Sequence, residues 1–157
     1  MRRSTRVRAL ASALIVGSLA QSAAPPALAA LGGDAASVQA DGLHMKGQLR
    51  VSTSPSGYQV HEIQLPSGTV VREYVSADNK VFAVSWRGPS IPDLRQTLGT
   101  FFPQYVAASR LPHGGHHHLD ISQPGLVAHS SGNMRAYFGF AYVPDLLPPG
   151  FTAAEIN

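Results

Sequence analysis

Four histidines lie between residues 113 and 118, in the segment HGGHHH, and form the densest group of possible metal ligands in the chain. Imidazole nitrogen binds Zn²⁺, Cu²⁺ and Ni²⁺ well. If the segment is extended, His116 and His118 share one side of it, and Asp120 adds a carboxylate. We therefore regard His113, His116 and His118 as candidate metal ligands. Because the two glycines raise the entropic cost of ordering such a site, a solvated loop is the favoured interpretation.

The sequence contains no complete motif of a hydrolase. The segment HEIQL at 61–65 has Leu65 where the zinc-protease motif H-E-x-x-H requires a second histidine. The same segment has the pattern of a β-strand, so we interpret His61 and the glutamate after it as ordinary strand residues. No G-x-S-x-G nucleophile motif occurs, and Ser67 and Ser131 precede glycines in segments typical of turns. We therefore predict no catalytic residue and no cofactor.

The elements around these residues are mostly β. Stretches with alternating apolar and polar residues, or rich in β-branched residues, predict strands. The short turns PSG and SADNK favour antiparallel pairing of the first three. The predicted strands are 58–65, 69–75, 81–86, 117–122, 126–130 and 134–143.

A helix is predicted between the third and fourth of these strands. Ser90 and Asp93 fit an N-terminal capping box, and apolar residues recur at helical spacing as far as Val106. Pro103 lies within this stripe and removes a backbone donor, so we expect a kink or a break there. A shorter helix, capped by Asp34, is expected to run to about Asp41, where Gly42 would stop it.

Together these elements predict an α+β fold. We expect a single antiparallel β-sheet, made of a meander of three strands, a helix and two to three further strands, with the kinked helix packed on one face. The predicted organisation is a signal peptide at 1–29, an N-terminal arm with a short helix and linker at 30–57, and a core domain at 58–157. The residues expected to be buried together between sheet and helix are Phe82, Val84, Trp86, Leu98, Phe102, Phe138 and Phe140.

The first 29 residues have the three parts of an export signal. Four arginines precede an apolar stretch at 9–20, and the sequence Ala27-Leu28-Ala29 then provides a cleavage site before Ala30. The apolar stretch is too short to cross a bilayer as a helix. The residues after the paired arginines lack the apolar pair of a twin-arginine signal, so we favour general secretion to the periplasm or the medium.

Removal of this segment changes the charge of the chain. Four of the 12 Lys and Arg residues lie before the cleavage site, which leaves eight basic residues against nine acidic ones, a formal net charge of −1. This balance argues against nucleic acid as a partner. The chain contains no cysteine, which excludes disulfides, thiol nucleophiles and Fe–S clusters. The longest apolar stretch after the cleavage site, 136–143, predicts a buried strand and no transmembrane segment.

Four segments of the chain resemble a known family: LGGDA at 31–35, HEIQLPSGTVVREYV at 61–75, VFAVSWRGP at 81–89 and PDLR at 92–95. They are similar to an exported family of Burkholderia-like proteobacteria known as domain of unknown function 2844. The resemblance covers nearly all of the chain after residue 30. It implies export and a single domain, but it brings no activity, ligand or site residue. The His-rich segment at 113–118 is not part of it.

Three functional hypotheses remain. The leading one is a non-enzymatic periplasmic or secreted accessory domain that binds an envelope protein or a cell-surface component. The alternative is a periplasmic metal-binding protein that uses the His-rich loop 113–118. The least favoured is a hydrolase, which would need a pocket that combines a serine or glutamate with His44, His61 or His129.

Overall fold

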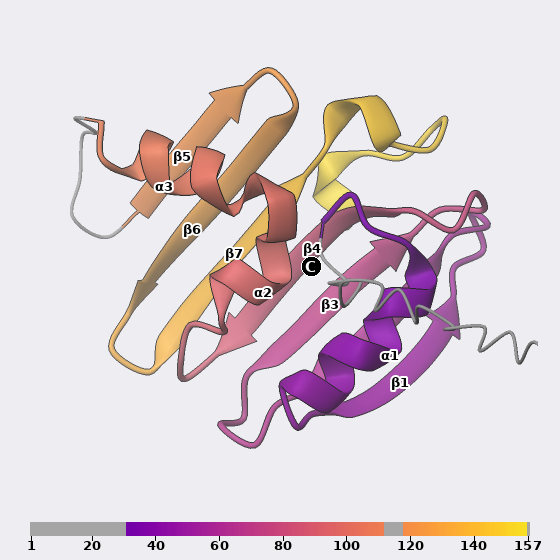
Figure 1. Ribbon diagram of the computed structural model, residues 1–157, viewed down its shortest axis with the longest axis horizontal. Coiled ribbons are helices and arrows are strands. Elements are labelled where there is room, and N and C mark those ends of the chain that lie inside the picture. The colour runs from indigo at the N-terminus through magenta and orange to yellow at the C-terminus, as the bar shows by residue number, and fades with distance from the viewer. Residues whose placement is uncertain (1–30, 112–117, 157) are drawn as a thin grey trace, which may run out of the picture.

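The computed structural model describes residues 31–111 and 118–156 (Figure 1). The predicted signal peptide lies outside these residues, as do His113 and His116. The helical elements are α1 (Ala35–His44), α2 (Leu94–Leu98), α3 (Phe102–Ser109) and three 3₁₀ turns, η1 (Gly99–Phe101), η2 (Pro144–Leu146) and η3 (Ala153–Glu155). The strands are β1 (Gln48–Thr53), β2 (Gln59–Gln64), β3 (Val70–Val75), β4 (Val81–Gly88), β5 (His118–Gln123), β6 (Leu126–Asn133) and β7 (Ala136–Tyr142).

All seven strands form one antiparallel sheet in the order β1-β2-β3-β4-β7-β6-β5. The predicted layout of a three-strand meander, one kinked helix and two to three further strands is therefore wrong. Four strands precede α2, three follow α3, and α1 lies ahead of them all. The combination of helices with an antiparallel sheet still fits the α+β class. The miscount comes from β1, since each of the other six strands overlaps a predicted range.

The sequence does not predict β1 because its two apolar residues, Leu49 and Val51, give an alternating pattern too short to distinguish from the N-terminal arm. This strand has the sequence QLRVST and forms one edge of the sheet, where only Leu49 is half-buried and its other residues are exposed. A strand that buries so little surface needs only a short apolar pattern. Its place is set by pairing with β2, in which Leu49 lies opposite the fully buried Ile63.

The helical segment after β4 is broken, in a different way from the one predicted. The side chain of Asp93 caps α2 by accepting bonds from the backbone N–H groups of Arg95 and Gln96. Ser90, the predicted cap, instead accepts a bond from Thr69 through its backbone carbonyl at 2.7 Å. The helix ends at Gly99 (φ 50°), and α3 begins again with a proline in its first turn. No helix in the described ranges is long and apolar enough to cross a membrane.

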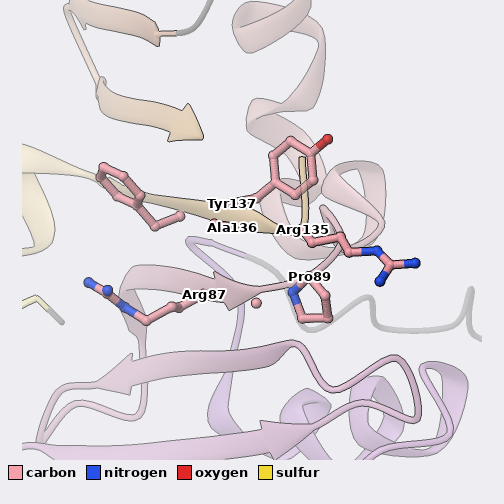
Figure 2. A pocket seen from close by; sticks show the side chains of 7 residues that line it. Arg87, Pro89, Arg135, Ala136 and Tyr137 are labelled. Atoms are coloured by element: carbon pink, nitrogen blue, oxygen red, sulfur yellow. The ribbon is translucent and has the colours of Figure 1, made fainter. Parts of the chain in front are cut away.

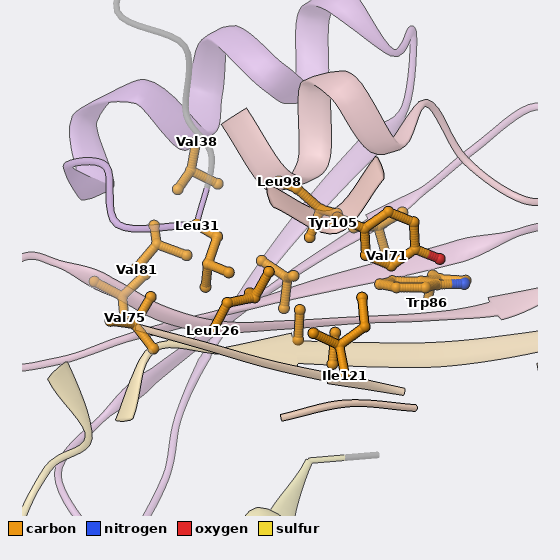
Figure 3. Close-up of a cluster of buried hydrophobic side chains, with 14 of the residues drawn as sticks. Leu31, Val38, Val71, Val75, Val81, Trp86, Leu98, Tyr105, Ile121 and Leu126 are labelled. Atoms are coloured by element: carbon orange, nitrogen blue, oxygen red, sulfur yellow. The ribbon is translucent and has the colours of Figure 1, made fainter. Parts of the chain in front are cut away.

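The main core lies between one face of the sheet and the helices (Figure 3). Trp86 and Val84 of β4 pack there with Leu98 of α2. Gly139 of β7 makes room for the indole, because a Cβ at this position would come within 2.3 Å of the Trp86 ring. The predicted core is only partly correct, since its members do not all lie on this face. Phe138 is 40 % exposed on the opposite face, and Phe82 belongs to a second cluster.

This second cluster covers part of the face opposite the helices. Residues 144–156, which include η2 and η3, pack over aromatic residues from β3 and β4. The ring of Phe151 makes edge contacts with Phe82 at 4.8 Å and with Tyr58 at 5.3 Å, measured between ring centroids. The proline-rich C-terminal segment is therefore part of the packed structure. It lies near the end of the sheet where the β3–β4 turn is found (Figure 1).

Candidate binding surface

Two rows of side chains cross the sheet on the face opposite the helices, beside the part that residues 144–156 cover. Residues that lie directly opposite each other in an antiparallel pair point to the same face, so the register defines each row. We call these two rows the polar face. The first row is Arg50, Glu62, Arg72, Ser85, Phe140, His129 and Asp120, and the second is Gln48, Gln64, Val70, Arg87, Phe138, Ser131 and His118.

His129 of β6 is held from three sides on this face. Its Nδ1 lies 2.5 Å from Oδ1 of Asp120 on β5. Its ring packs between those of Phe138 and Phe140, with both centroid distances 5.7 Å. The His129 side chain is 27 % exposed and that of Asp120 is 68 % exposed. The imidazole therefore has a fixed orientation while it remains reachable from solvent.

Arg87 of β4 lies beside this histidine and its flanking rings. Its guanidinium carbon is 5.7 Å from the centroid of the Phe138 ring, within the range of a cation–π contact. Within the ranges 31–111 and 118–156, no carboxylate forms an ion pair with Arg87. Arg72 on the same face does have such a partner, Glu62, at 2.9 Å. Arg87 is thus an exposed cation that is positioned by an aromatic ring and available to an anionic group.

A shallow pocket of about 270 Å³ lies at the end of β4 and the beginning of β7. Arg87, Pro89 and Arg135 contribute to its lining, together with Tyr137 and Phe138 (Figure 2). The two arginine side chains point away from each other in this view. They therefore flank the pocket and do not converge on one point within it.

A second group of ionisable residues is buried on the helical side of the sheet. Asp41 of α1 and Glu73 of β3 are both fully buried, and His61 lies directly opposite Glu73 on β2. Gln96 of α2 donates a hydrogen bond to Asp41. Burial raises the pKa of Glu73 well above its ordinary value, and the neighbouring Asp41 raises it further. Burial also lowers the pKa of His61.

This buried group is suited to a structural role. Two neighbouring carboxyl groups in an apolar core can share a hydrogen bond only when one of them is protonated. A neutral His61 and a protonated Glu73 avoid the cost of an unpaired buried charge. Because both carboxyl groups have no solvent exposure, we assign the candidate binding surface to the polar face and not to this group.

The residues that the sequence singled out are widely separated. His118 is exposed at the start of β5, on the polar face, whereas His113 and His116 lie outside the described residues. In the part of the chain that the structure describes, no three His, Asp or Glu side chains are placed to hold a metal ion. His61 and Glu62 are successive residues of β2 that point to opposite faces, as expected for a strand.

The contact between Asp120 and His129 was not predicted from the sequence. The signal was available in the segment QPG at 123–125, which forms a tight turn between β5 and β6. Pairing the two strands about this turn places Asp120 opposite His129. The contact between Asp41 and Glu73 has no such local signal in the sequence, because Asp41 lies in α1 and Glu73 lies in β3, far apart along the chain.

Comparison with known proteins gives a family but no characterised relative. The family model described as "Protein of unknown function (DUF2844)" matches residues 27–156, which is most of the chain. No curated protein and no solved structure matches.

Proposed function

We propose that this chain, which belongs to the DUF2844 family, is an exported, non-enzymatic binding domain that holds a protein of the cell envelope on its polar face. The observation that carries the proposal is the exposed group of Arg87, Phe138 and His129 on three adjacent strands. Export is proposed from the signal-like sequence of residues 1–29.

The composition of the polar face supports a protein as the partner. Aromatic residues and arginine are enriched in protein interfaces and dominate their binding energy. Phe138, which is 40 % exposed, supplies apolar surface at the centre, and Arg87 supplies a cation beside it. The strands and the Asp120 contact fix these side chains before binding, so little conformational entropy is lost on association.

Site-specific crosslinking in the envelope tests this proposal. A photoreactive phenylalanine at position 138 should form an adduct with a defined partner protein. The matched control places the same residue at Val51, which is 55 % exposed on the other face of the sheet. The double variant Phe138→Ala, Arg87→Ala should weaken binding of the purified partner by about 30-fold or more, the loss typical of central interface residues. Equal adducts at both positions, or unchanged affinity, would contradict the proposal.

Metal binding is a second candidate, and one observation favours it. Asp120 holds Nδ1 of His129, an arrangement that orients imidazole ligands in metal sites, and His118 lies on the same face. The ligands predicted from the sequence are His113, His116 and His118, of which only His118 lies in the described part of the chain. Titration calorimetry with Zn²⁺ and Cu²⁺ should then give a one-to-one site tighter than about 10 nM that is lost in His118→Ser, His129→Gln. Micromolar binding would indicate only the general affinity of a His-rich segment.

A further inference from the structure

Some of the exposed charged side chains of the described residues gather at the two ends of the sheet. One end, which we call the turn rim, contains the β2–β3 and β6–β7 turns, the end of β4 and the start of β1. It carries the exposed cations Lys46, Arg87 and Arg135. Two carboxylates near this end already have protein partners: Asp93 caps α2, and Glu62 pairs with Arg72 at 2.9 Å. Figure 1 shows these turns along the lower left margin of the molecule.

The opposite end of the sheet is acidic. The β3–β4 turn and residues 144–156 meet there, and Asp78 and Asp145 line one pocket between them. Asp34 joins this end through its contact with Lys80 at 2.6 Å, and Glu155 joins it through a bond from the Tyr58 hydroxyl at 3.3 Å. The protein therefore has a cationic end and an acidic end, although the chain from residue 30 onward has a formal net charge of only −1.

The turn rim also carries apolar side chains that solvent surrounds. Met134 is 91 % exposed and Leu43 is 81 % exposed, the two highest values among large apolar residues of the described chain. Met134 and Arg135 form the two-residue turn between β6 and β7, with Arg135 at φ 65°. Glycine and asparagine are the residues that favour this left-handed conformation. The turn instead presents one long apolar and one long cationic side chain.

We propose that the turn rim docks on the surface of an anionic lipid bilayer. The exposed side chains of Met134 and Leu43 can enter the headgroup layer of a bilayer between the lipids. The cations beside them can contact the lipid phosphate groups. The width of the rim supports a flat partner. Leu43 precedes β1 and Met134 follows β6, so about 24 Å of sheet separates these two strands at the usual spacing.

The directions of the arginine side chains argue against a single small anion. Arg87 and Arg135 point away from each other, so one phosphate ion cannot contact both (Figure 2). Two separate headgroups of a bilayer can each contact one of the two arginines. In this orientation the acidic end faces away from the lipid. The polar face stands beside the membrane, and the two surfaces share only Arg87, which lies at the boundary between them.

Vesicle binding by the processed chain, residues 30–157, tests the inference. The protein should sediment with vesicles of phosphatidylglycerol and phosphatidylcholine at low salt but not with pure phosphatidylcholine. Each cation near an anionic surface contributes a factor of about 5 in partitioning, so Lys46→Gln, Arg135→Gln should lower it about 25-fold. Neither residue belongs to the polar face. Lys80→Gln at the acidic end is the matched control and should leave partitioning unchanged.

A second variant reports on the contact itself. The fluorescence of Met134→Trp should shift to shorter wavelength with the anionic vesicles, whereas that of Val51→Trp, exposed on β1 away from the rim, should not. Inorganic phosphate should release no more protein from the anionic vesicles than chloride does at the same ionic strength. Equal binding to both vesicle types, no binding at all, equal loss in Lys80→Gln, or specific release by phosphate would each overturn the inference.

Discussion

The pair of Asp41 and Glu73 shows how one buried residue makes the fold sensitive to pH. Glu73 faces Asp41 from α1 and His61 from β2, Gln96 of α2 contacts Asp41, and an apolar residue, Val84, lies opposite on β4. No arginine or lysine is buried in the described chain to balance a charge there. The sequence gives no indication of this environment, because the strand VVREYV shows two charged residues in succession.

The stability of the protein should fall as the pH rises from about 4.5, the ordinary pKa of a glutamate, through the raised pKa of Glu73. Below this window Glu73 is protonated in both the folded and the unfolded states. Within the window only the folded state holds the proton, so unfolding becomes more favourable by up to about 1.4 kcal/mol per pH unit. Glu73→Gln removes this titration and should flatten the profile of unfolding free energy against pH.

Chemical denaturation between pH 4.5 and pH 9 provides the measurement for Glu73. Asp78→Asn, in the exposed β3–β4 turn, is the control and should keep the wild-type slope. A Glu73→Gln variant with the wild-type slope would show that another group is responsible for it.

Among the secondary-structure elements, the strands of high apolar content could be predicted from the sequence. The edge strand and the C-terminal segment, whose positions depend on tertiary contacts, could not. The segments of β3, β4 and β7 are rich in β-branched or aromatic residues, so their local pattern is sufficient. The edge strand β1 has only a short pattern, with two apolar residues, and the segment 144–156 is interrupted by prolines. Which face of β7 is buried could not be predicted either, because Phe138 and Phe140 point away from the main core while Gly139 between them makes room for Trp86.

Packing of the C-terminal segment against the second cluster should contribute substantially to stability. Phe151 is the residue of this segment that contacts three aromatic rings, those of Tyr58, Tyr74 and Phe82. Phe151→Ala should therefore lower the unfolding free energy by about 2–4 kcal/mol, somewhat less than for a fully buried ring. Phe151→Leu, which keeps most of the apolar volume, should lose about half as much or less. A loss below about 0.5 kcal/mol for Phe151→Ala, measured by thermal or chemical unfolding, would mean that the segment is not docked in solution.

At the scale of the whole molecule, the described fold begins close to the proposed cleavage site. Leu31 is 1 % exposed in the main core, and its N–H donates to the carbonyl of Thr97 at 3.2 Å. Gly32 donates in turn to Val81 at 2.8 Å. Cleavage after Ala29 would leave a single residue before this anchored segment.

We therefore predict that the chain is exported and cleaved between Ala29 and Ala30. Intact mass and N-terminal sequencing of the periplasmic fraction and the medium should give a chain that starts at residue 30. Ala29→Phe should block cleavage, because the site requires small residues, and the precursor should accumulate. Leu31→Ala should instead be cleaved normally but lose about 2–4 kcal/mol of stability through the cavity it leaves. An uncleaved wild-type chain in the cytoplasm would contradict export, and with it both proposed roles at the envelope.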